Sequence, residues 1–184
     1  MAHGLLDLDR LPTSELERIV RTGEPPEFGT LDGWVFMGAN VTAPGSLLFR
    51  KFSKGFFTET RRDGRKRPMG YNVACYSSPL EEEWKVKPDA QNAKAFGFYS
   101  CKVVRTGEPD ALYPGSLLLN YGEGQNGLDL SRFLRDYLVR VEPGNDDLFL
   151  GKAYLALGPA LVPAGFFAIK RWAKAPAKPP RPAP

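Results

Sequence analysis

Glycine and proline recur so often that they divide this chain into short segments. The 184 residues include 19 Gly and 17 Pro. Both residues interrupt helices and mark turns, so the composition favours a protein of strands and turns over a helical bundle. The pair Asp63-Gly64, between two strand-like segments, is typical of a β-hairpin. We expect about eight strands, at Leu31–Gly38, Leu47–Phe57, Met69–Tyr76, Ala95–Val104, Leu117–Tyr121, Tyr137–Val141, Leu148–Leu157 and Phe166–Trp172.

The predicted fold class is mainly β, as a single antiparallel β-barrel or, alternatively, a β-sandwich. A meander of hairpins must close or cover its edges, and a closed barrel of about eight strands can hold one small ligand. A chain of 184 residues suits one domain. We divide it into an N-terminal helical segment at 1–23, the barrel at 24–172 and a basic, Pro-rich tail at 173–184 that we expect to be disordered.

The N-terminal segment contains one clear helix signal. Ser14 and Glu17 have the spacing of a capping box, and Gly23 suits the end of the helix. The apolar stripe of this helix consists of Leu16, Ile19 and Val20. The helix therefore needs a larger body against which to pack.

An uncharged run at 153–169 approaches the length of a membrane-spanning helix. Pro159 and Pro163 fall in its middle, together with two glycines, so two strands joined by a loop fit it better than a helix. The first residues, MAHGLLDLDR, have neither a basic start nor an apolar stretch of the kind found in secretory leaders. We expect a cytoplasmic protein.

The loop Gly122-Glu123-Gly124-Gln125-Asn126-Gly127 has the glycine spacing of a dinucleotide-binding loop. A parallel pair of strands needs a crossover of a dozen or more residues, and the segment after this loop is too short to provide it. The segment 137–141 is β-like and is followed directly by a turn. We interpret the loop as a flexible segment at one end of the barrel and a candidate lid. The apolar residues that could cap the barrel there are Leu130, Phe133 and Leu134.

Several kinds of chemistry lack their usual residues. His3 is the single histidine and lies at the chain terminus, so nucleophilic triads, haem ligation and His-rich metal sites are not expected. Cys75 and Cys101 form no CxxC motif. We favour two buried free thiols, with a disulfide as the alternative if their strands are adjacent. We expect no metal and no cofactor.

Carboxylates, tyrosines and amides remain as groups for acid–base chemistry. The first candidates are Asp136 and Tyr121. The further candidates are Asp129, Glu123, Tyr71, Tyr99 and Asn72. If the protein is an enzyme, this set favours an isomerase, cyclase or lyase without a cofactor. Solvated carboxylates and tyrosines at the edge of a core are the commoner outcome for such residues.

A basic cluster surrounds the predicted hairpin turn. It consists of Arg61, Arg62, Arg65, Lys66 and Arg67, with Arg50, Lys51 and Lys54 near it in the sequence. Basic residues among phenylalanines can bind nucleic acid or an anionic membrane surface. Charge also keeps the tip of a hairpin soluble, and we favour this simpler interpretation. The net charge is +4. Among anionic partners we consider a membrane surface, and we do not expect a nucleic acid.

Two short segments resemble the calycin superfamily of lipocalins and fatty-acid-binding proteins. They are Gly33-Trp34 in the first strand and Arg171 in the last strand, FFAIKRW. In calycins, a Trp near the closed end of the barrel packs under an Arg from the last strand. The segments 31–34, 136–141, 147–153 and 166–171 are also similar to GXWXG-type bacterial domains, over roughly Leu31 to Trp172. The resemblance implies a lipocalin-like barrel that binds a small apolar molecule, with structural roles for Gly33, Trp34 and Arg171.

The aromatic residues expected to line the pocket are Trp34, Phe36, Phe49, Phe57, Tyr71, Phe98 and Tyr154. The alternative is that they fill the core. Our leading hypothesis is binding or carriage of a small hydrophobic molecule, such as a lipid or fatty acid, rather than catalysis. The alternatives are an acid–base enzyme on the same barrel and an interaction module that works through 61–67.

Overall fold

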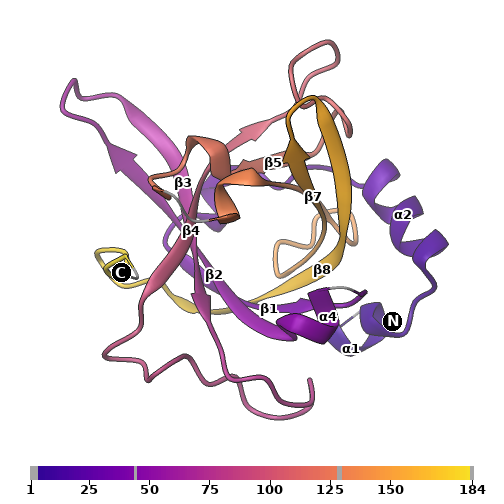
Figure 1. Cartoon of the computed structure of the whole chain (residues 1–184), viewed down its shortest axis with the longest axis horizontal. Coiled ribbons are helices and arrows are strands. Elements are labelled where there is room, and N and C mark those ends of the chain that lie inside the picture. The colour runs from indigo at the N-terminus through magenta and orange to yellow at the C-terminus, as the bar shows by residue number, and fades with distance from the viewer. Residues whose placement is uncertain (1–3, 44, 128–129, 183–184) are drawn as a thin grey trace.

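The computed structural model describes residues 4–43, 45–127 and 130–182 and shows a closed antiparallel barrel of eight strands (Figure 1). Each strand pairs with its neighbours in the sequence, and β8 closes the ring by pairing with both β7 and β1. The strands are β1 Trp34–Asn40, β2 Lys51–Thr60, β3 Lys66–Ala74, β4 Ala95–Val103, β5 Leu117–Asn120, β6 Leu134–Arg140, β7 Leu148–Leu157 and β8 Ala160–Lys174. The predicted barrel is confirmed and the sandwich alternative is wrong.

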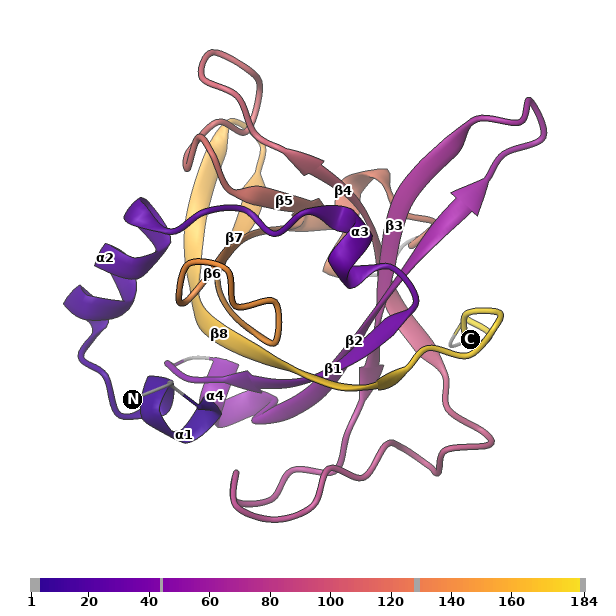
Figure 2. The ribbon, with the colours of Figure 1, turned by 180° about the vertical axis from the view of Figure 1, so that it is seen from behind.

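The barrel has two unlike ends. At one end lie the turn between β2 and β3 and the loops at 104–116 and 141–147. The short helix α3, Phe28–Leu31, covers this end (Figure 2), and Leu31 packs into the core with Phe36 and Phe56. At the other end lie α4, Gly45–Leu48, and the short 3-10 helices η1, Tyr121–Glu123, and η2, Leu130–Phe133. This second end is the open one.

The first helices pack on the outside of the barrel. They are α1, Leu5–Asp9, and α2, Thr13–Thr22, and α2 buries the predicted stripe of Leu16, Ile19 and Val20 against β6 and β7. The predicted capping box is wrong, because the helix begins at Thr13 with Pro12 as its N-cap and has no side-chain cap. Pro12 is extended, with φ −65° and ψ 150°, and this conformation sets the helix start before Ser14.

The pair predicted from the resemblance lies at the covered end. The Arg171 guanidinium carbon lies 4.4 Å from the centre of the Trp34 ring. Arg171 also donates hydrogen bonds to the carbonyls of Thr30 and Asp146, at 3.0 and 2.6 Å. Gly33 adopts φ +74°, which favours glycine, at the entry to β1. These contacts join β8, β1 and the segment around α3.

The C-terminal segment does not separate from the barrel at residue 172. β8 continues to Lys174, and the Arg181 carbonyl accepts a hydrogen bond from the Ala95 amide at 2.9 Å. The donor is the backbone N–H of Ala95, at the start of β4. A Pro-rich segment can accept such a bond because proline keeps its backbone carbonyl. The expected disorder of the Pro-rich tail at 173–184 stays a prediction. Cys75 and Cys101 are both buried and free, so the disulfide alternative is excluded.

Glycines within the strands set how closely neighbouring strands can pack. Four of them lie directly opposite an aromatic residue, in the pairs Gly38–Phe52, Gly55–Tyr71, Gly70–Tyr99 and Gly151–Phe167. A Cβ atom added to any of the four would lie only 2.1 or 2.2 Å from the ring. Each ring thus occupies the space that a side chain would need, which is a known role for glycine in strands.

We predict that Gly151→Ala lowers the free energy of unfolding by about 1–3 kcal/mol, because the Phe167 ring must move out of a well-packed site. Gly29→Ala is the matched control, since nothing lies within 4 Å of a Cβ added there. Urea denaturation of the two variants checks the prediction. Equal free energies of unfolding for both variants would contradict it.

A second prediction concerns pH and the docking of α2. Burial raises the pKa of Glu17, but hydrogen bonds from Lys152 and Tyr113 outweigh it and leave the pKa below the ordinary 4.5. The carboxylate therefore stabilises the fold fully above pH 4.5, and this contribution is lost as the pH falls through the lowered pKa. We expect Glu17→Gln to flatten the loss of stability in that acid range, and exposed Glu81→Gln to leave it unchanged. Urea denaturation across a pH series measures both, and parallel curves for wild type and Glu17→Gln would refute the assignment.

Candidate functional site

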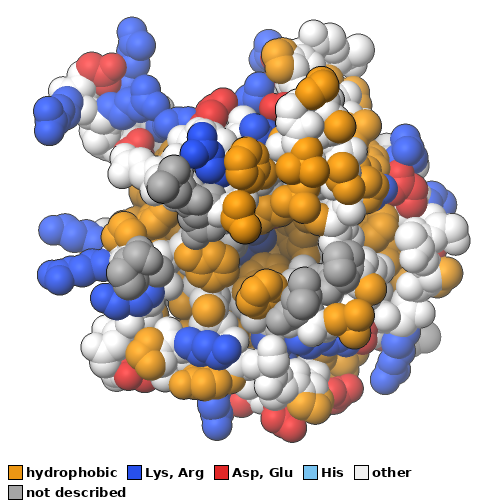
Figure 3. Space-filling model, viewed as in Figure 1, with side chains coloured by type: hydrophobic (Ala, Val, Ile, Leu, Met, Phe, Trp, Pro, Cys, Tyr) orange, Lys and Arg blue, Asp and Glu red, His pale blue; other side chains and the backbone are white. Residues whose placement is uncertain are grey.

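A cavity of about 220 Å³ enters the barrel from its open end. Figure 3 shows it as a hollow bordered by hydrophobic side chains. We call it the barrel cavity, and its lining consists of Asn40, Phe49, Phe52, Lys54, Asn72, Phe96, Tyr121, Leu134, Asp136, Ala153, Ala164 and Phe167. Large hydrophobic residues are also exposed at this end, with Leu47, Phe49 and Leu130 at 82%, 70% and 77% exposure. Such apolar side chains around an opening are typical of a binding site.

A wider cleft continues the barrel cavity toward the surface. This outer cleft has a volume of about 550 Å³ and shares Phe49, Phe52, Phe96 and Leu134 with the barrel cavity. Leu130 of η2 and Leu155 of β7 line its outer part. The two cavities therefore share an apolar wall, and Lys51, Lys87 and Ser77 add polar groups to the outer cleft.

Four polar side chains form what we call the polar floor of the barrel cavity: Lys54, Asn72, Tyr121 and Asp136. Lys54 comes from β2 and Asn72 lies directly opposite it on β3, so both side chains point to the same face of the sheet. Asp136 is in β6, opposite Leu119 of β5, and Tyr121 follows β5 at the start of η1. The strand register thus directs residues from four separate segments to one point.

Lys54 is the centre of the polar floor. Its Nζ atom donates to Asp136 Oδ2 at 3.0 Å, to Asn72 Oδ1 at 3.0 Å and to Tyr121 Oη at 2.5 Å. Three acceptors match the three N–H groups of an ammonium ion. Burial lowers the pKa of Lys54, while the carboxylate of Asp136 opposes this effect. The geometry suits a charged lysine paired with a carboxylate.

Tyr121 links the other members of the polar floor. Its hydroxyl donates to Asp136 Oδ2 at 2.9 Å and accepts from Asn72 Nδ2 at 3.1 Å. Burial raises the pKa of Tyr121 well above its ordinary value, and the nearby charge of Asp136 raises it further. The hydroxyl therefore keeps its proton and acts as a donor.

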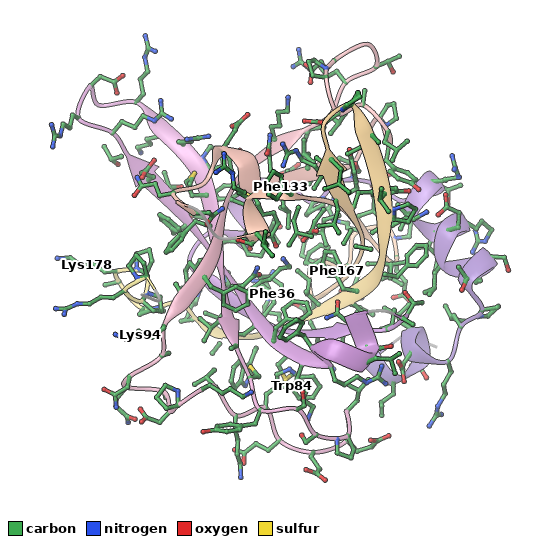
Figure 4. All side chains as sticks on the ribbon, viewed as in Figure 1. Phe36, Trp84, Lys94, Phe133, Phe167 and Lys178 are labelled. Atoms are coloured by element: carbon green, nitrogen blue, oxygen red, sulfur yellow. The ribbon has the colours of Figure 1, made fainter. Side chains whose placement is uncertain are left out.

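Aromatic rings surround the Lys54 ammonium. Nζ lies 4.9 Å from the centre of the Tyr99 ring and 5.0 Å from that of Phe167. Cation–π attraction to these rings offsets part of the loss of hydration. Figure 4 shows Phe36 and Phe167 inside the barrel, where Phe36 belongs to the packed core of the covered end.

Asp136 uses only one of its two carboxylate oxygens. Oδ2 accepts from both Lys54 and Tyr121, whereas buried Oδ1 has no hydrogen-bond partner among the residues that the structure describes. The side chain is only 5% exposed. A buried acceptor without a partner is unfavourable, so this oxygen is suited to contact a bound molecule.

The structure brings together the two first acid–base candidates, Asp136 and Tyr121, at the polar floor. Glu123 instead pairs with Arg67 at 2.7 Å and accepts from Ser100 at 2.8 Å. Asn72 belongs to the polar floor and Tyr99 packs beside it, whereas Tyr71 faces outward in a cluster with Phe57 and Phe98. Asp129 and His3 lie outside the described residues.

Of the seven aromatics expected to line the pocket, Phe49 is the one that lines the barrel cavity. Phe36 lies deeper in the core, and Trp34 lies at the covered end. Phe57, Tyr71 and Phe98 pack together on the outer face, and Tyr154 packs outside with Tyr113 and Tyr137. Outward and inward positions alternate along a strand, and a bulge in β4 near Gly97 shifts this alternation.

The sequence interpretation missed Lys54 as an interior residue and grouped it with the basic cluster. Lys51 is buried as well, 4.0 Å from the centre of a Trp84 ring. One signal was present: Phe52, Lys54 and Phe56 alternate along one face of β2. Phe52 and Phe167 were also not expected to line the cavity. The inward direction of the Lys54 side chain is set by the strand register of the barrel.

The basic residues at 61–67 lie on a projecting hairpin between β2 and β3, visible in Figure 1 at the upper left. Arg61, Arg62, Arg65 and Lys66 are exposed at its tip, whereas Arg67 pairs with Glu123. By the strand directions, this tip extends from the covered end, away from the barrel cavity. An anionic surface as its partner stays a prediction.

The glycine-rich loop is not a dinucleotide-binding loop. It joins β5 and β6, which are antiparallel neighbours, and in the described residues only the short 3-10 helix η2 lies between the loop and β6, with no α-helix. Asn126 fastens it to β4, because its side chain accepts from the Phe98 amide and donates to the Phe98 carbonyl, both at 2.7 Å. Its role as a lid stays a prediction.

In the described part of the chain, no group of three or more His, Cys, Asp or Glu residues could hold a metal ion. None of its helices has the length and apolar character needed to cross a membrane.

Comparison with protein families, with curated protein sequences and with solved structures found no match to this chain. The class of the protein is therefore defined by its structure alone. It is a closed eight-stranded antiparallel barrel with a cavity that ends in a buried lysine–aspartate pair.

We predict that Asp136→Leu lowers the free energy of unfolding by about 3–5 kcal/mol, because it leaves the buried Lys54 charge without its partner. Adding Lys54→Met should restore most of the loss, since the double variant leaves no charge at the polar floor. Urea denaturation of the wild type, both single variants and the double variant gives the coupling energy. Additive effects of the two substitutions would show that the pair is not coupled.

Proposed function

We propose that this protein binds a small, mostly apolar molecule in the barrel cavity. The observation that carries the proposal is the polar floor at the end of an apolar, open cavity. Binding sites for small molecules combine apolar walls with a few well-placed polar groups in this way. The walls supply hydrophobic contact, and the polar floor supplies orientation.

The distribution of side chains along the barrel supports this proposal over a filled core. Large side chains fill the covered end, including Phe36, Phe56 and Phe149. The open half instead has two small residues, Ala153 and Ala164, on the cavity wall. Their size leaves the space that aromatic residues take up at the other end.

A second candidate function is proton transfer on the bound molecule. The observation that favours it is Oδ1 of Asp136, which has no partner among the described residues and belongs to the carboxylate that accepts from the Tyr121 hydroxyl through Oδ2. A carboxylate oxygen at this position can accept a proton from the bound molecule, while the hydrogen bonds from Lys54 and Tyr121 to Oδ2 hold the carboxylate in place. Nuclear magnetic resonance of an enolisable ketone in deuterated water tests it. Deuterium uptake that does not depend on Asp136 would exclude the enzyme.

We predict that Ala153→Phe weakens binding of octanol at least about tenfold, because the added ring occupies the barrel cavity. Ala173→Phe is the matched control, since Ala173 is exposed near the other end of β8. Isothermal titration calorimetry gives the affinities, and thermal unfolding confirms that both variants are folded. Native mass spectrometry of the purified protein shows whether a ligand is already bound. Equal octanol affinity in all three proteins would place any binding outside the barrel cavity.

A further inference from the structure

The polar floor restricts the chemical group of a ligand that can bind next to it. This inference rests on the proposed function. Lys54 and Tyr121 would be the natural donors to an anionic group such as a carboxylate. All three N–H groups of Lys54 already have acceptors, and the Tyr121 hydroxyl donates to Asp136. An incoming anion would have to break this network.

Charge leads to the same conclusion. Lys54 and Asp136 form a buried pair, with 2% and 5% of their side chains exposed. A carboxylate placed beside them would add an uncompensated negative charge next to Asp136, in surroundings of low polarity. An ammonium group would instead lie close to Lys54 and be repelled. The charges therefore favour a neutral group.

The unsatisfied atom at the polar floor is an acceptor. Oδ1 of Asp136 is buried and has no partner among the described residues. A ligand that supplies a hydrogen-bond donor satisfies it without disturbing the bonds that Oδ2 makes to Lys54 and Tyr121. The apolar walls, with Phe49, Phe52 and Phe96 among them, require that the rest of the ligand be hydrocarbon.

We propose that the ligand is a neutral apolar alcohol or phenol whose hydroxyl group donates a hydrogen bond to Asp136 Oδ1. Free fatty acids and other carboxylates are excluded from this position. The barrel cavity thus selects its ligand by a donor group, and the lysine serves to hold Asp136 rather than to bind the ligand.

The test compares three probes that are each built on a linear chain of eight carbon atoms, the carboxylate carbon included: octanol, octyl methyl ether and octanoate at neutral pH. Isothermal titration calorimetry should show octanol binding about tenfold or more tightly than the ether, because a hydrogen bond to a buried carboxylate is lost with the ether. Octanoate should bind more weakly than the ether. Octanoate or ether binding as tightly as octanol would overturn this inference and leave the proposed function standing. Failure of all three to bind would overturn both.

The double variant Lys54→Met with Asp136→Leu provides a second readout in a protein without a charge at the polar floor. It should lose the preference for octanol over the ether while still binding the ether. The matched control is Lys152→Met with Glu17→Leu, which removes a lysine–carboxylate pair of 2.6 Å between β7 and α2, on the outside of the barrel. This control should keep the preference. A double variant that also keeps it would show that Asp136 does not select the ligand.

Discussion

The pair of Lys54 and Asp136 spans the inside of the barrel, and the open half of the structure is arranged around it. β2 and β6 are four strands apart in a ring of eight, so the two residues come from opposite walls. The bonds from Lys54 to Asp136 and Tyr121 join β2 to β6 and η1, with which β2 does not pair through its backbone. A buried ion pair contributes little net stability, but its directional contacts restrict how the walls can be placed. The depth of the barrel cavity follows from the position of this contact.

The covered end depends on packing rather than on charge. Phe36, Phe56 and Phe149 fill it. Beside the polar floor, the Tyr99 and Phe167 rings lie against glycines of neighbouring strands. These close approaches let large side chains fill the interior without forcing the strands apart. The Arg171 and Trp34 contact then ties the last strand to the first at the same end. The barrel is thus solid at one end and hollow at the other, and this difference in filling places the candidate site.

The polar floor distinguishes this barrel from a simple apolar container. A core of the same volume could be filled with hydrophobic side chains at no loss of stability. Here a lysine, a carboxylate and a tyrosine hydroxyl lie at the end of an apolar cavity, and Oδ1 of Asp136 has no hydrogen-bond partner in the part of the chain that the structure describes. Perturbed ionisable groups in a cavity are more common at functional sites than elsewhere. This arrangement links the proposed function to particular atoms rather than to the fold alone.

The sequence by itself determined the class of the fold and the positions of most strands. Turn residues such as Asp63-Gly64 and the short apolar segments are local signals, and they specify where the chain extends and where it reverses. Asp136 and Tyr121 could be selected as acid–base candidates because the sequence has a single histidine, His3, and two cysteines without a CxxC motif. Local sequence does not determine whether a side chain points into the barrel or out of it. That direction depends on strand register, on the bulge in β4 and on the closure of β8 against β1. A shift of one residue turns a side chain to the other face, and for this reason Tyr71 lies outside the barrel whereas Lys54 lies within it.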